Sequence, residues 1–385
     1  MLHQRILLAL LAGACLMSTV ASVSAGEKLW VYFGTYTKGD SKGIYRAEFD
    51  TSTGKLSAAQ VAAEVKDPSF LAIHPDGKHL YAVSEVNDTD GKPVGGVVGF
   101  QLNPANGELT KINGQSSGGA GPCHLIVDPS GKNVLAANYT GGSVICLPIK
   151  DDGSLEEAAS FIQHEGSSVD PRRQAGPHAH SINTAPGNHF AVAADLGLDK
   201  ILIYRFDPET GSLKPNDPAF VRTPQGGGPR HFAFHPNGKF AYTNNEILLS
   251  VTAFEFNGER GILNPLQTTS TVEDGTPLKG NSTAEVRVHP NGKYVYVSNR
   301  GPNSIAAFKI DQNTGLLERV GIVSTGGKTP RNFNLTPDGK WLLAANQDSK
   351  NVVVFKINDE TGLPEPTGDE IEVPNCVCVR FLAKP

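Results

Sequence analysis

The chain has 385 residues, of which 39% are hydrophobic and 19% charged, and this composition excludes a disordered chain because it supplies enough apolar side chains for a sizeable core. The formal net charge of −5 at pH 7 argues against a general nucleic-acid-binding protein, which would normally carry a basic face. The 42 glycines and 26 prolines are spread along the chain, which indicates many turns between short strands.

Residues 1–25 have the pattern of a secretory signal peptide. His3 and Arg5 precede an apolar run at 6–20, and small residues at 23–25 are typical of a signal peptidase site. The apolar run is too short for a comfortable transmembrane helix. We therefore expect cleavage after Ala25, a periplasmic or secreted mature chain at 26–385, and no membrane attachment after cleavage.

Four cysteines remain in the mature chain: Cys123, Cys146, Cys376 and Cys378. An exported protein can pair such residues in disulfides, but the connectivity cannot be derived from sequence. Buried free thiols are the alternative interpretation.

An internal repeat determines the expected fold. A pattern of the type Phe70-Leu-Ala-Ile-His-Pro-Asp-Gly77 recurs about every 50 residues, with turn glycines at 77, 131, 187, 238, 292 and 339. In each unit an alternating strand leads into a Pro-x-Gly turn, and three further short strands follow. Four short strands per unit are typical of a propeller blade.

The two ends of the mature chain complete the repeat. Residues 29–50 match the later part of a unit without its first strand, and residues 376–382 match a first strand without the rest. Together they form a seventh blade, and closing the ring in this way shields the sheet edges. We therefore predict one all-β domain at 26–385, a seven-bladed β-propeller with four antiparallel strands per blade.

The repeat also separates scaffold residues from candidate site residues. His74, His235 and His289 recur in the His-Pro-x-Gly turns, and this recurrence indicates a structural role. Polar residues that differ between blades at one position serve another purpose.

Three such positions meet at one end of the central channel, because the first and second strands of a blade are antiparallel. The first position, seven residues before the turn glycine, contains Phe70, His124, His180, His231, Glu285 and Asn332. The residues just before these are Ser69, Cys123, Ala179, Arg230, Ala284 and Arg331. The third position, at the end of the second strand, contains Glu85, Tyr139, Asp195, Glu246, Arg300 and Gln347.

Histidines and arginines gathered at a channel mouth favour a binding site for a small anion. A solvated channel without chemistry is the alternative. His178 and His180 have the same-face spacing that a zinc site can use, but the sequence fixes no third ligand, so we expect neither a metal nor a cofactor.

Several motifs resemble those of the lactonase propeller family, which includes the propeller-type 6-phosphogluconolactonases and the fungal carboxymuconate lactonizing enzymes. They are Gly34-Thr-Tyr-Thr, Gly121-Pro-Cys-His124, Gly228-Pro-Arg-His231 with Asn245-Glu246, and Ser298-Asn-Arg300. The resemblance spans the whole mature chain.

This resemblance implies His180, Arg230, Glu246 and Arg300 as catalytic residues, with His178 as an alternative to His180. We expect secondary substrate contacts from His124, His178, His231, Glu285 and Arg331. The implied function is hydrolysis of a sugar-acid lactone, a small anionic or lactone substrate, in carbohydrate metabolism. Export favours an unphosphorylated lactone. A lactonizing cycloisomerase and a non-catalytic binding propeller are the alternatives.

Overall fold

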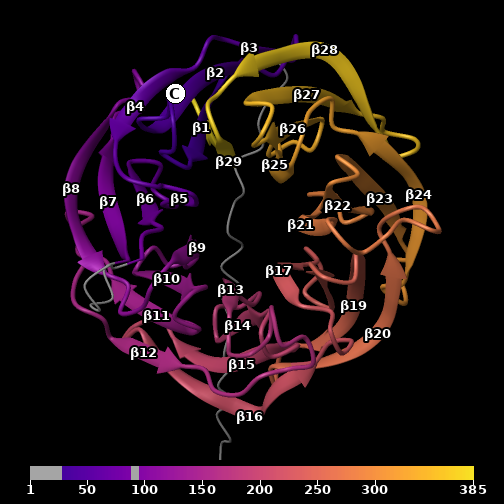
Figure 1. Ribbon diagram of the computed structural model, residues 1–385. Helices are drawn as coiled ribbons and strands as arrows, with labels where there is room; N and C mark the ends of the chain where they lie inside the picture. The colour runs from indigo at the N-terminus through magenta and orange to yellow at the C-terminus, as the bar shows by residue number, and fades with distance from the viewer. Residues whose placement is uncertain (1–27, 88–94) are drawn as a thin grey trace, which may run out of the picture.

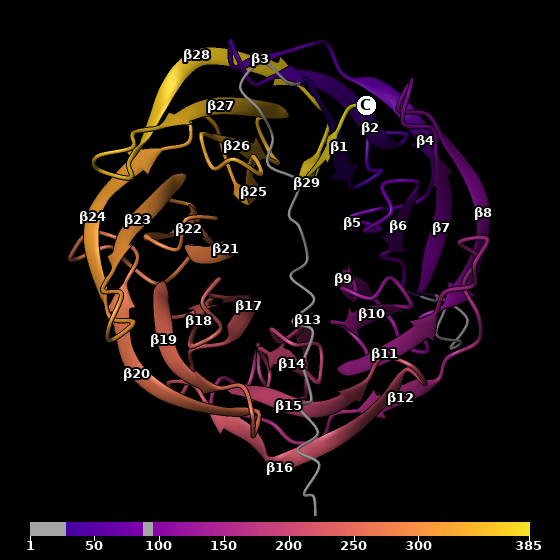
Figure 2. The ribbon, with the colours of Figure 1, turned by 180° about the vertical axis from the view of Figure 1, so that it is seen from behind.

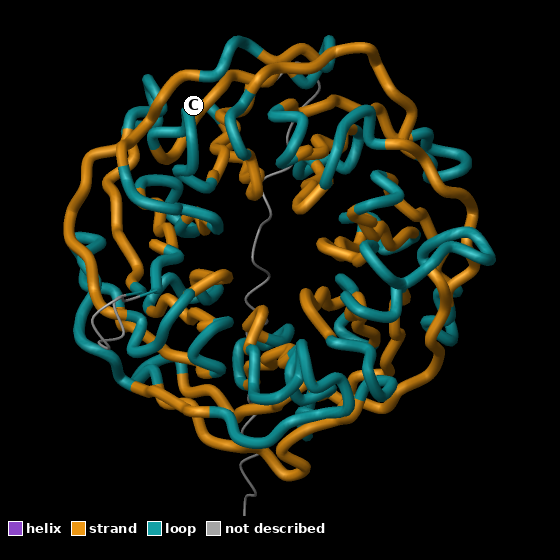
Figure 3. The backbone as a smooth tube through the Cα atoms, in the orientation of Figure 1, coloured by secondary structure: helices purple, strands orange, loops and turns teal. Residues whose placement is uncertain are grey.

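The computed structural model describes residues 28–87 and 95–385, and the predicted signal peptide lies outside these ranges. The described residues form strands, turns and loops, with no helix that could cross a membrane (Figure 3). Seven sheets stand around a central axis and form a closed ring (Figures 1 and 2). The predicted seven-bladed propeller is confirmed.

Six of these sheets have four antiparallel strands each, in chain order from the axis outward. The first sheet contains β5 (Leu71–Ile73), β6 (His79–Ser84), β7 (Gly96–Leu102) and β8 (Leu109–Ser116). The second contains β9 (Pro122–Val127), β10 (Asn133–Asn138), β11 (Ser143–Pro148) and β12 (Ser160–Gln163). The third contains β13 (Ala179–Thr184), β14 (Phe190–Asp195), β15 (Lys200–Asp207) and β16 (Ser212–Arg222). The fourth sheet contains β17 (Pro229–Phe234), β18 (Phe240–Asn245), β19 (Ser250–Asn257) and β20 (Ile262–Ser270). The fifth contains β21 (Ser282–Val288), β22 (Tyr294–Arg300), β23 (Ser304–Ile310) and β24 (Leu317–Ser324). The sixth contains β25 (Pro330–Leu335), β26 (Trp341–Asn346), β27 (Asn351–Ile357) and β28 (Pro364–Glu372).

The seventh sheet joins the two ends of the chain. It contains β29 (Cys376–Ala383), β1 (Lys28–Thr35), β2 (Gly43–Asp50), β3 (Lys55–Leu56) and β4 (Gln60–Glu64), so its outer strand is split into two. The pairing of β29 with β1 runs antiparallel from Leu29 opposite Ala383 to Thr35 opposite Cys376 (Figure 1). This pairing closes the ring as predicted.

The middle strands supply the core because both of their faces pack against neighbouring blades. Strand β26, for example, is buried at every position. One apolar cluster joins Tyr296 and Ile305 of one blade to Phe333 and Leu342 of the next. The outermost strands are mostly exposed or half-buried, as β28 is after its first residue, because one of their faces meets solvent.

The repeated histidines connect neighbouring blades. The Nε2 atoms of His74, His235 and His289 donate hydrogen bonds of 2.8, 2.7 and 2.9 Å to the carbonyl oxygens of Gly131, Gly292 and Gly339 in the next blade. At Gly131 the backbone has φ +74°, and a Cβ atom there would lie 2.6 Å from His74 Nε2. The predicted structural role of these histidines is confirmed.

Candidate active site

A layer of side chains from the innermost strands fills the channel. We call it the channel layer, and it consists of Phe70, His124, Ser181, His231, Glu285, Asn332 and Cys378. The sequence repeat placed His180 in this layer, and that placement is wrong by one residue, because Asn188 rather than Gly187 closes the turn of this blade. Ser181 therefore lies opposite Ala194 as His124 lies opposite Ala137, and His180 takes the position of Cys123 and Arg230. The ring centroids of His124 and His180 lie 5.3 and 5.4 Å from that of His231. Nδ1 of His231 lies 2.9 Å from Oε1 of Glu285, and Asn332 donates to the other Glu285 oxygen.

Irregular strand pairing directs consecutive side chains toward the channel. The register between the first and second strands shifts between Ala179 and Ser181, between Pro229 and Phe232, and between Thr283 and Val286. A β-bulge re-aims the side chains beside it, so the usual alternation of faces is interrupted. Arg230 and His231 are therefore both buried near the axis, although they are adjacent in sequence.

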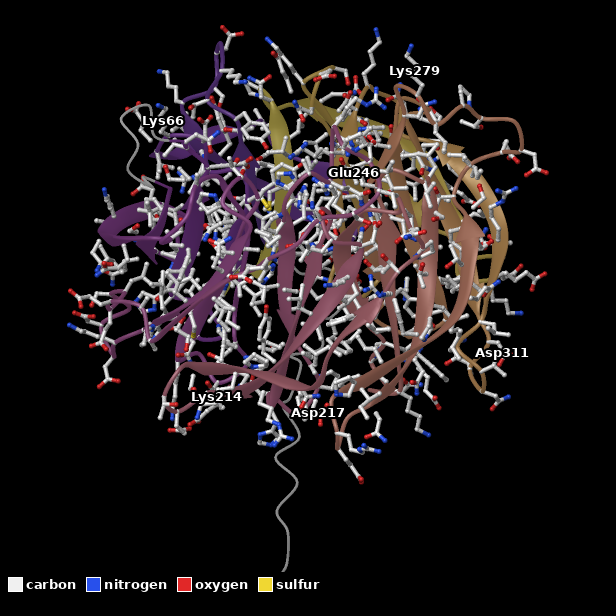
Figure 4. All side chains as sticks on the ribbon, turned by 60° about the horizontal axis from the view of Figure 1, so that its bottom comes forward. Lys66, Lys214, Asp217, Glu246, Lys279 and Asp311 are labelled. Atoms are coloured by element: carbon white, nitrogen blue, oxygen red, sulfur yellow. The ribbon has the colours of Figure 1, made fainter. Side chains whose placement is uncertain are left out.

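A pocket of about 350 Å³ lies at one end of this layer, within the usual size range of small-molecule sites. We call it the arginine pocket, and it is lined by Glu85, Cys123, Tyr139, Arg173, His180, Glu246, Ser282, Arg300 and Arg331. A narrower cavity that shares Glu85, Cys123 and Arg331 continues inward to Arg230 and His231. In Figure 4, Glu246 lies inside the ring, on the side of Lys66 and Lys279 and away from Lys214.

Glu246 is the centre of the arginine pocket because three guanidinium groups surround it. Its carboxylate oxygens lie 2.6 Å from Arg173 Nη2, 2.9 Å from Arg230 Nε and 3.0 Å from Arg300 Nη2. Burial acts to raise the pKa of Glu246, but Arg300, Arg230 and the other cations hold it well below its usual value. Glu246 is therefore ionised, and its negative charge fixes the positions of the three arginine side chains around it.

The buried Arg230 and the half-buried Arg300 lie beside Glu246. Arg230, only 2% exposed, has its pKa lowered to about 10 by burial and by repulsion from Arg331 and Arg300. Burial also lowers the pKa of Arg300. The Nε atom of Arg300 is buried without a hydrogen-bond acceptor, whereas that of Arg230 faces Glu246 in their ion pair. An unpaired guanidinium donor favours the binding of an anion.

A second carboxyl group lies in the same pocket in a different environment. Glu85 accepts hydrogen bonds from Ser69 Oγ and, over 2.9 Å, from the hydroxyl of Tyr36. Arg331 Nη2 lies 3.0 Å from the same hydroxyl. Burial raises the pKa of Glu85 despite the nearby Arg331. One pocket thus contains a carboxylate that stays ionised and a carboxyl group that gains a proton more easily, a division typical of acid–base sites.

His180 and His178 have separate surroundings. The imidazole of His180 lines the arginine pocket, with Nδ1 3.6 Å from the thiol sulfur of Cys123. Burial, followed by repulsion from Arg230, holds the pKa of His180 well below 6.5, so the ring is neutral. His178 instead stacks on Tyr139 at a centroid distance of 4.7 Å, and its Nδ1 donates to the Tyr139 carbonyl oxygen over 2.9 Å.

Arg173 comes from the loop at 164–178, between β12 and β13. The start of this loop is fixed by His164, whose Nδ1 lies 2.6 Å from the Asp195 carboxylate and whose Nε2 lies 2.7 Å from the Tyr204 hydroxyl. Near its end, Gln174 donates to Asp199 over 2.7 Å. These buried contacts hold Arg173 in reach of Glu246.

The predicted site residues lie at different depths in the channel. His180, Glu246, Arg300 and Arg331 line the arginine pocket, and Arg230 and His231 line its inward extension. Glu285 belongs to the channel layer behind His231. His124 lines the pocket at the opposite end of the channel, and His178 packs against Tyr139.

Sequence reasoning missed Arg173 and Tyr36. Arg173 belongs to the loop at 164–178, outside the repeated strands and turns, although the length of this segment between two repeats was a signal. In the closing blade Thr35 pairs with Cys376, and in the preceding blade Asn346 pairs with Pro330, so Thr35 and Asn346 are equivalent. The residue after Thr35, Tyr36, is therefore the seventh member of the position that contains Glu85 and Glu246. The split blade concealed this equivalence.

The structure shows the state of the cysteines and the position of the candidate metal ligands. Cys123, Cys146, Cys376 and Cys378 are buried free thiols, the second of the two interpretations. Within the described ranges, the one group of three closely spaced potential metal ligands is His74, Asp76 and His79 in a turn between strands, outside the arginine pocket.

The chain belongs to the seven-bladed β-propeller lactonase family, whose model matches residues 30–381. A relative from Bacillus subtilis named 6-phosphogluconolactonase is 39% identical over 78% of this chain and 83% of its own length. One of the same name from Formosa agariphila is 34% identical over 79% and 85%. The solved periplasmic gluconolactonase of Pseudomonas aeruginosa is 34% identical, with a TM-score of 0.87 over 93% of this chain and 100% of that one. The predicted 6-phosphogluconolactonase-like lactonase, a lactone-hydrolysing enzyme, is thereby confirmed.

Proposed function

We propose that this protein hydrolyses an unphosphorylated sugar-acid lactone in the arginine pocket, outside the cytoplasm. The main support for this proposal is that three guanidinium groups surround Glu246 next to the neutral imidazole of His180. Lactone opening requires an activated water, a stabilised oxyanion and a place for the product carboxylate. Each requirement has a candidate group in this pocket.

His180 is the proposed general base. Its neutral ring takes a proton from water, and the resulting hydroxide attacks the lactone carbonyl carbon. Glu246 is a poorer base because Arg173, Arg230 and Arg300 already occupy its carboxylate oxygens. Its task is to hold Arg230 and Arg300, which stabilise the negative charge on the carbonyl oxygen.

Glu85 is the proposed proton donor. When the tetrahedral intermediate collapses, the bond between the carbonyl carbon and the ring oxygen breaks, and this oxygen takes a proton from the Glu85 carboxyl group. The proton on His180 returns to Glu85 through solvent, so the cycle is balanced. The raised pKa of Glu85 favours the protonated form that this role needs.

Substrate binding rests on the charge of the pocket. Arg173, Arg230, Arg300 and Arg331 place four guanidinium groups near only two carboxyl groups, Glu85 and Glu246. This excess of positive charge attracts an anion and holds the carboxylate that forms on ring opening. We retain Arg331 and His231 as secondary contacts, and we assign no substrate contact to His124, His178 or Glu285.

The proposed location of the mature protein outside the cytoplasm supports an unphosphorylated substrate. The proposed signal peptide at 1–25 exports the mature chain at 26–385 to the periplasm or the medium. We expect phosphorylated sugar lactones mainly in the cytoplasm. Similarity to a periplasmic gluconolactonase supports the same location.

A substrate panel with the purified mature protein tests the proposal. We expect hydrolysis of D-glucono-1,5-lactone, measured by acid release at constant pH with the spontaneous rate subtracted, and slower hydrolysis of the 6-phospho derivative. Cyclisation of a muconate without lactone hydrolysis would replace the proposal with a cycloisomerase. Binding of gluconate without turnover of any lactone would identify a non-catalytic propeller.

A further inference from the structure

A second pocket lies at the opposite end of the channel layer. Its volume is about 470 Å³, larger than that of the arginine pocket. Its lining comes from residues that follow the channel layer along the innermost strands, such as Ala72, Ile126 and Arg287. Because all innermost strands run in the same direction, these residues lie on the side of the layer away from Glu246. We call this cavity the opposite pocket.

The repeat distinguishes scaffold from special residues here as well. The position two residues after the channel layer is apolar in three blades, where it contains Ala72, Ile126 and Ala233, and the blade between the last two contributes Asn183. In three adjacent blades it is polar, with Arg287 on β21, Asn334 on β25 and Arg380 on β29. The opposite pocket therefore has one apolar wall and one cationic wall.

Arg380 carries a charge that no acid neutralises directly. Its Nε and Nη1 atoms donate to the carbonyl oxygens of Leu71 and Val379 over 2.8 and 2.7 Å, and its guanidinium group lies 4.4 Å from the ring centroid of Phe70. Among the residues that the structure describes, no carboxylate forms an ion pair with it. Arg380 is half-buried, and a guanidinium group removed from much of its water without a counterion favours an anion that completes its surroundings.

Neighbouring donors are also incompletely paired. Arg287 reaches Glu285 only over 3.5 Å, and that carboxylate already accepts from His231 and Asn332. The Nε atom of Arg287 and the side-chain nitrogen of Asn183, which both belong to lining residues, are buried without an acceptor. Buried donors without acceptors are rare in folded proteins and point to a missing acceptor.

We propose that the opposite pocket is a second binding site, which takes a small organic carboxylate with an apolar body. The carboxylate lies between Arg287 and Arg380, and the apolar body packs against Ala72 and Ile126. This proposal is independent of the lactonase mechanism, because none of these residues lines the arginine pocket.

Calorimetric titration of the mature protein tests the site with three probes: benzoate, acetate and inorganic phosphate. We expect saturable binding of benzoate, and about tenfold weaker binding of acetate because acetate lacks the apolar body. Arg287→Gln should weaken benzoate binding about tenfold by removing a charge-assisted hydrogen bond. Arg300→Gln, which changes only the arginine pocket, should leave benzoate binding intact.

Asn183→Asp provides a second variant in case Arg287→Gln does not fold. Its added carboxylate should repel benzoate and weaken binding at least as strongly. Absence of saturable benzoate binding would overturn the proposal. Benzoate binding that is lost in Arg300→Gln but kept in Arg287→Gln would move the site to the arginine pocket. Phosphate binding as tight as benzoate binding would overturn the assignment to an apolar carboxylate.

Discussion

Arg173 Nη2 lies 2.6 Å from Glu246 Oε1, although 73 positions separate the two residues in the sequence. This contact joins the loop at 164–178 to the end of β18. Together with Arg230 and Arg300 it makes Glu246 the organiser of a cationic pocket. The charge of Glu246 determines where the arginines point, and the arginines keep Glu246 ionised.

Arg173→Gln tests the loop contribution. We expect kcat/KM for the lactone to fall about tenfold, because one of three charge-assisted contacts around Glu246 is lost while two remain. Arg172→Gln is the matched control, since the Arg172 side chain is 88% exposed. Equal rates for the two variants would remove Arg173 from the site.

The pH dependence of activity tests His180 as the base. Because the pKa of His180 lies well below 6.5, the ring is already neutral at pH 6.5 and remains neutral above it. We therefore expect His180 to cause no loss of kcat/KM as the pH falls to 6.5, and the decline should begin only at lower pH. Protonation of Glu85, the proposed acid, acts to raise kcat/KM as the pH falls. The measurement is initial acid release corrected for spontaneous hydrolysis. An acid limb at or above pH 6.5 would contradict this role.

Glu85→Gln tests the proposed proton donor. Loss of the acid should lower turnover of D-glucono-1,5-lactone about 100-fold, because the ring oxygen leaves unprotonated. An aryl lactone such as dihydrocoumarin, whose phenolate leaves without a proton, should lose far less. Similar losses for both substrates would indicate that Glu85 serves only to position its neighbours.

Stability should fall with acidification in a predictable window. Burial holds the pKa values of His124, His180 and His231 well below 6.5, so below pH 6.5 the unfolded chain binds protons that the folded chain excludes. Each histidine then lowers the free energy of unfolding by up to about 1.4 kcal/mol per pH unit. The raised pKa of Glu85 acts in the opposite direction, but it is a single group.

Urea unfolding at pH 7.5, 6.5 and 5.5 measures this loss. His124→Phe keeps an aromatic ring against Phe70, whose centroid lies 4.2 Å from that of His124, and removes one titrating group. Its stability should decline less steeply below pH 6.5. An unchanged slope would show that His124 is not buried as a neutral ring.

Much of the fold and part of the site could be predicted because the repeat provides its own comparison. The turn glycines and the incomplete units at the two ends required a closed ring, and the variable positions identified Glu246 and Arg300. The depth of each residue could not be predicted, since β-bulges at Arg230 and Glu285 interrupt the period of two on which such reasoning depends. His124 was consequently expected among the substrate contacts, although it lines the opposite pocket.

The most direct measurement is the lactone turnover of Glu246→Gln beside that of Lys214→Gln, a change on the far side of the ring (Figure 4). The neutral amide removes the charge that orders three arginines, so kcat/KM for D-glucono-1,5-lactone should fall about 100-fold or more, while circular dichroism shows both variants folded at the assay temperature. Lys214→Gln should match the wild type. Turnover by folded Glu246→Gln within about twofold of the wild type, a difference below 0.5 kcal/mol in barrier height, would contradict the proposal that this pocket opens lactones.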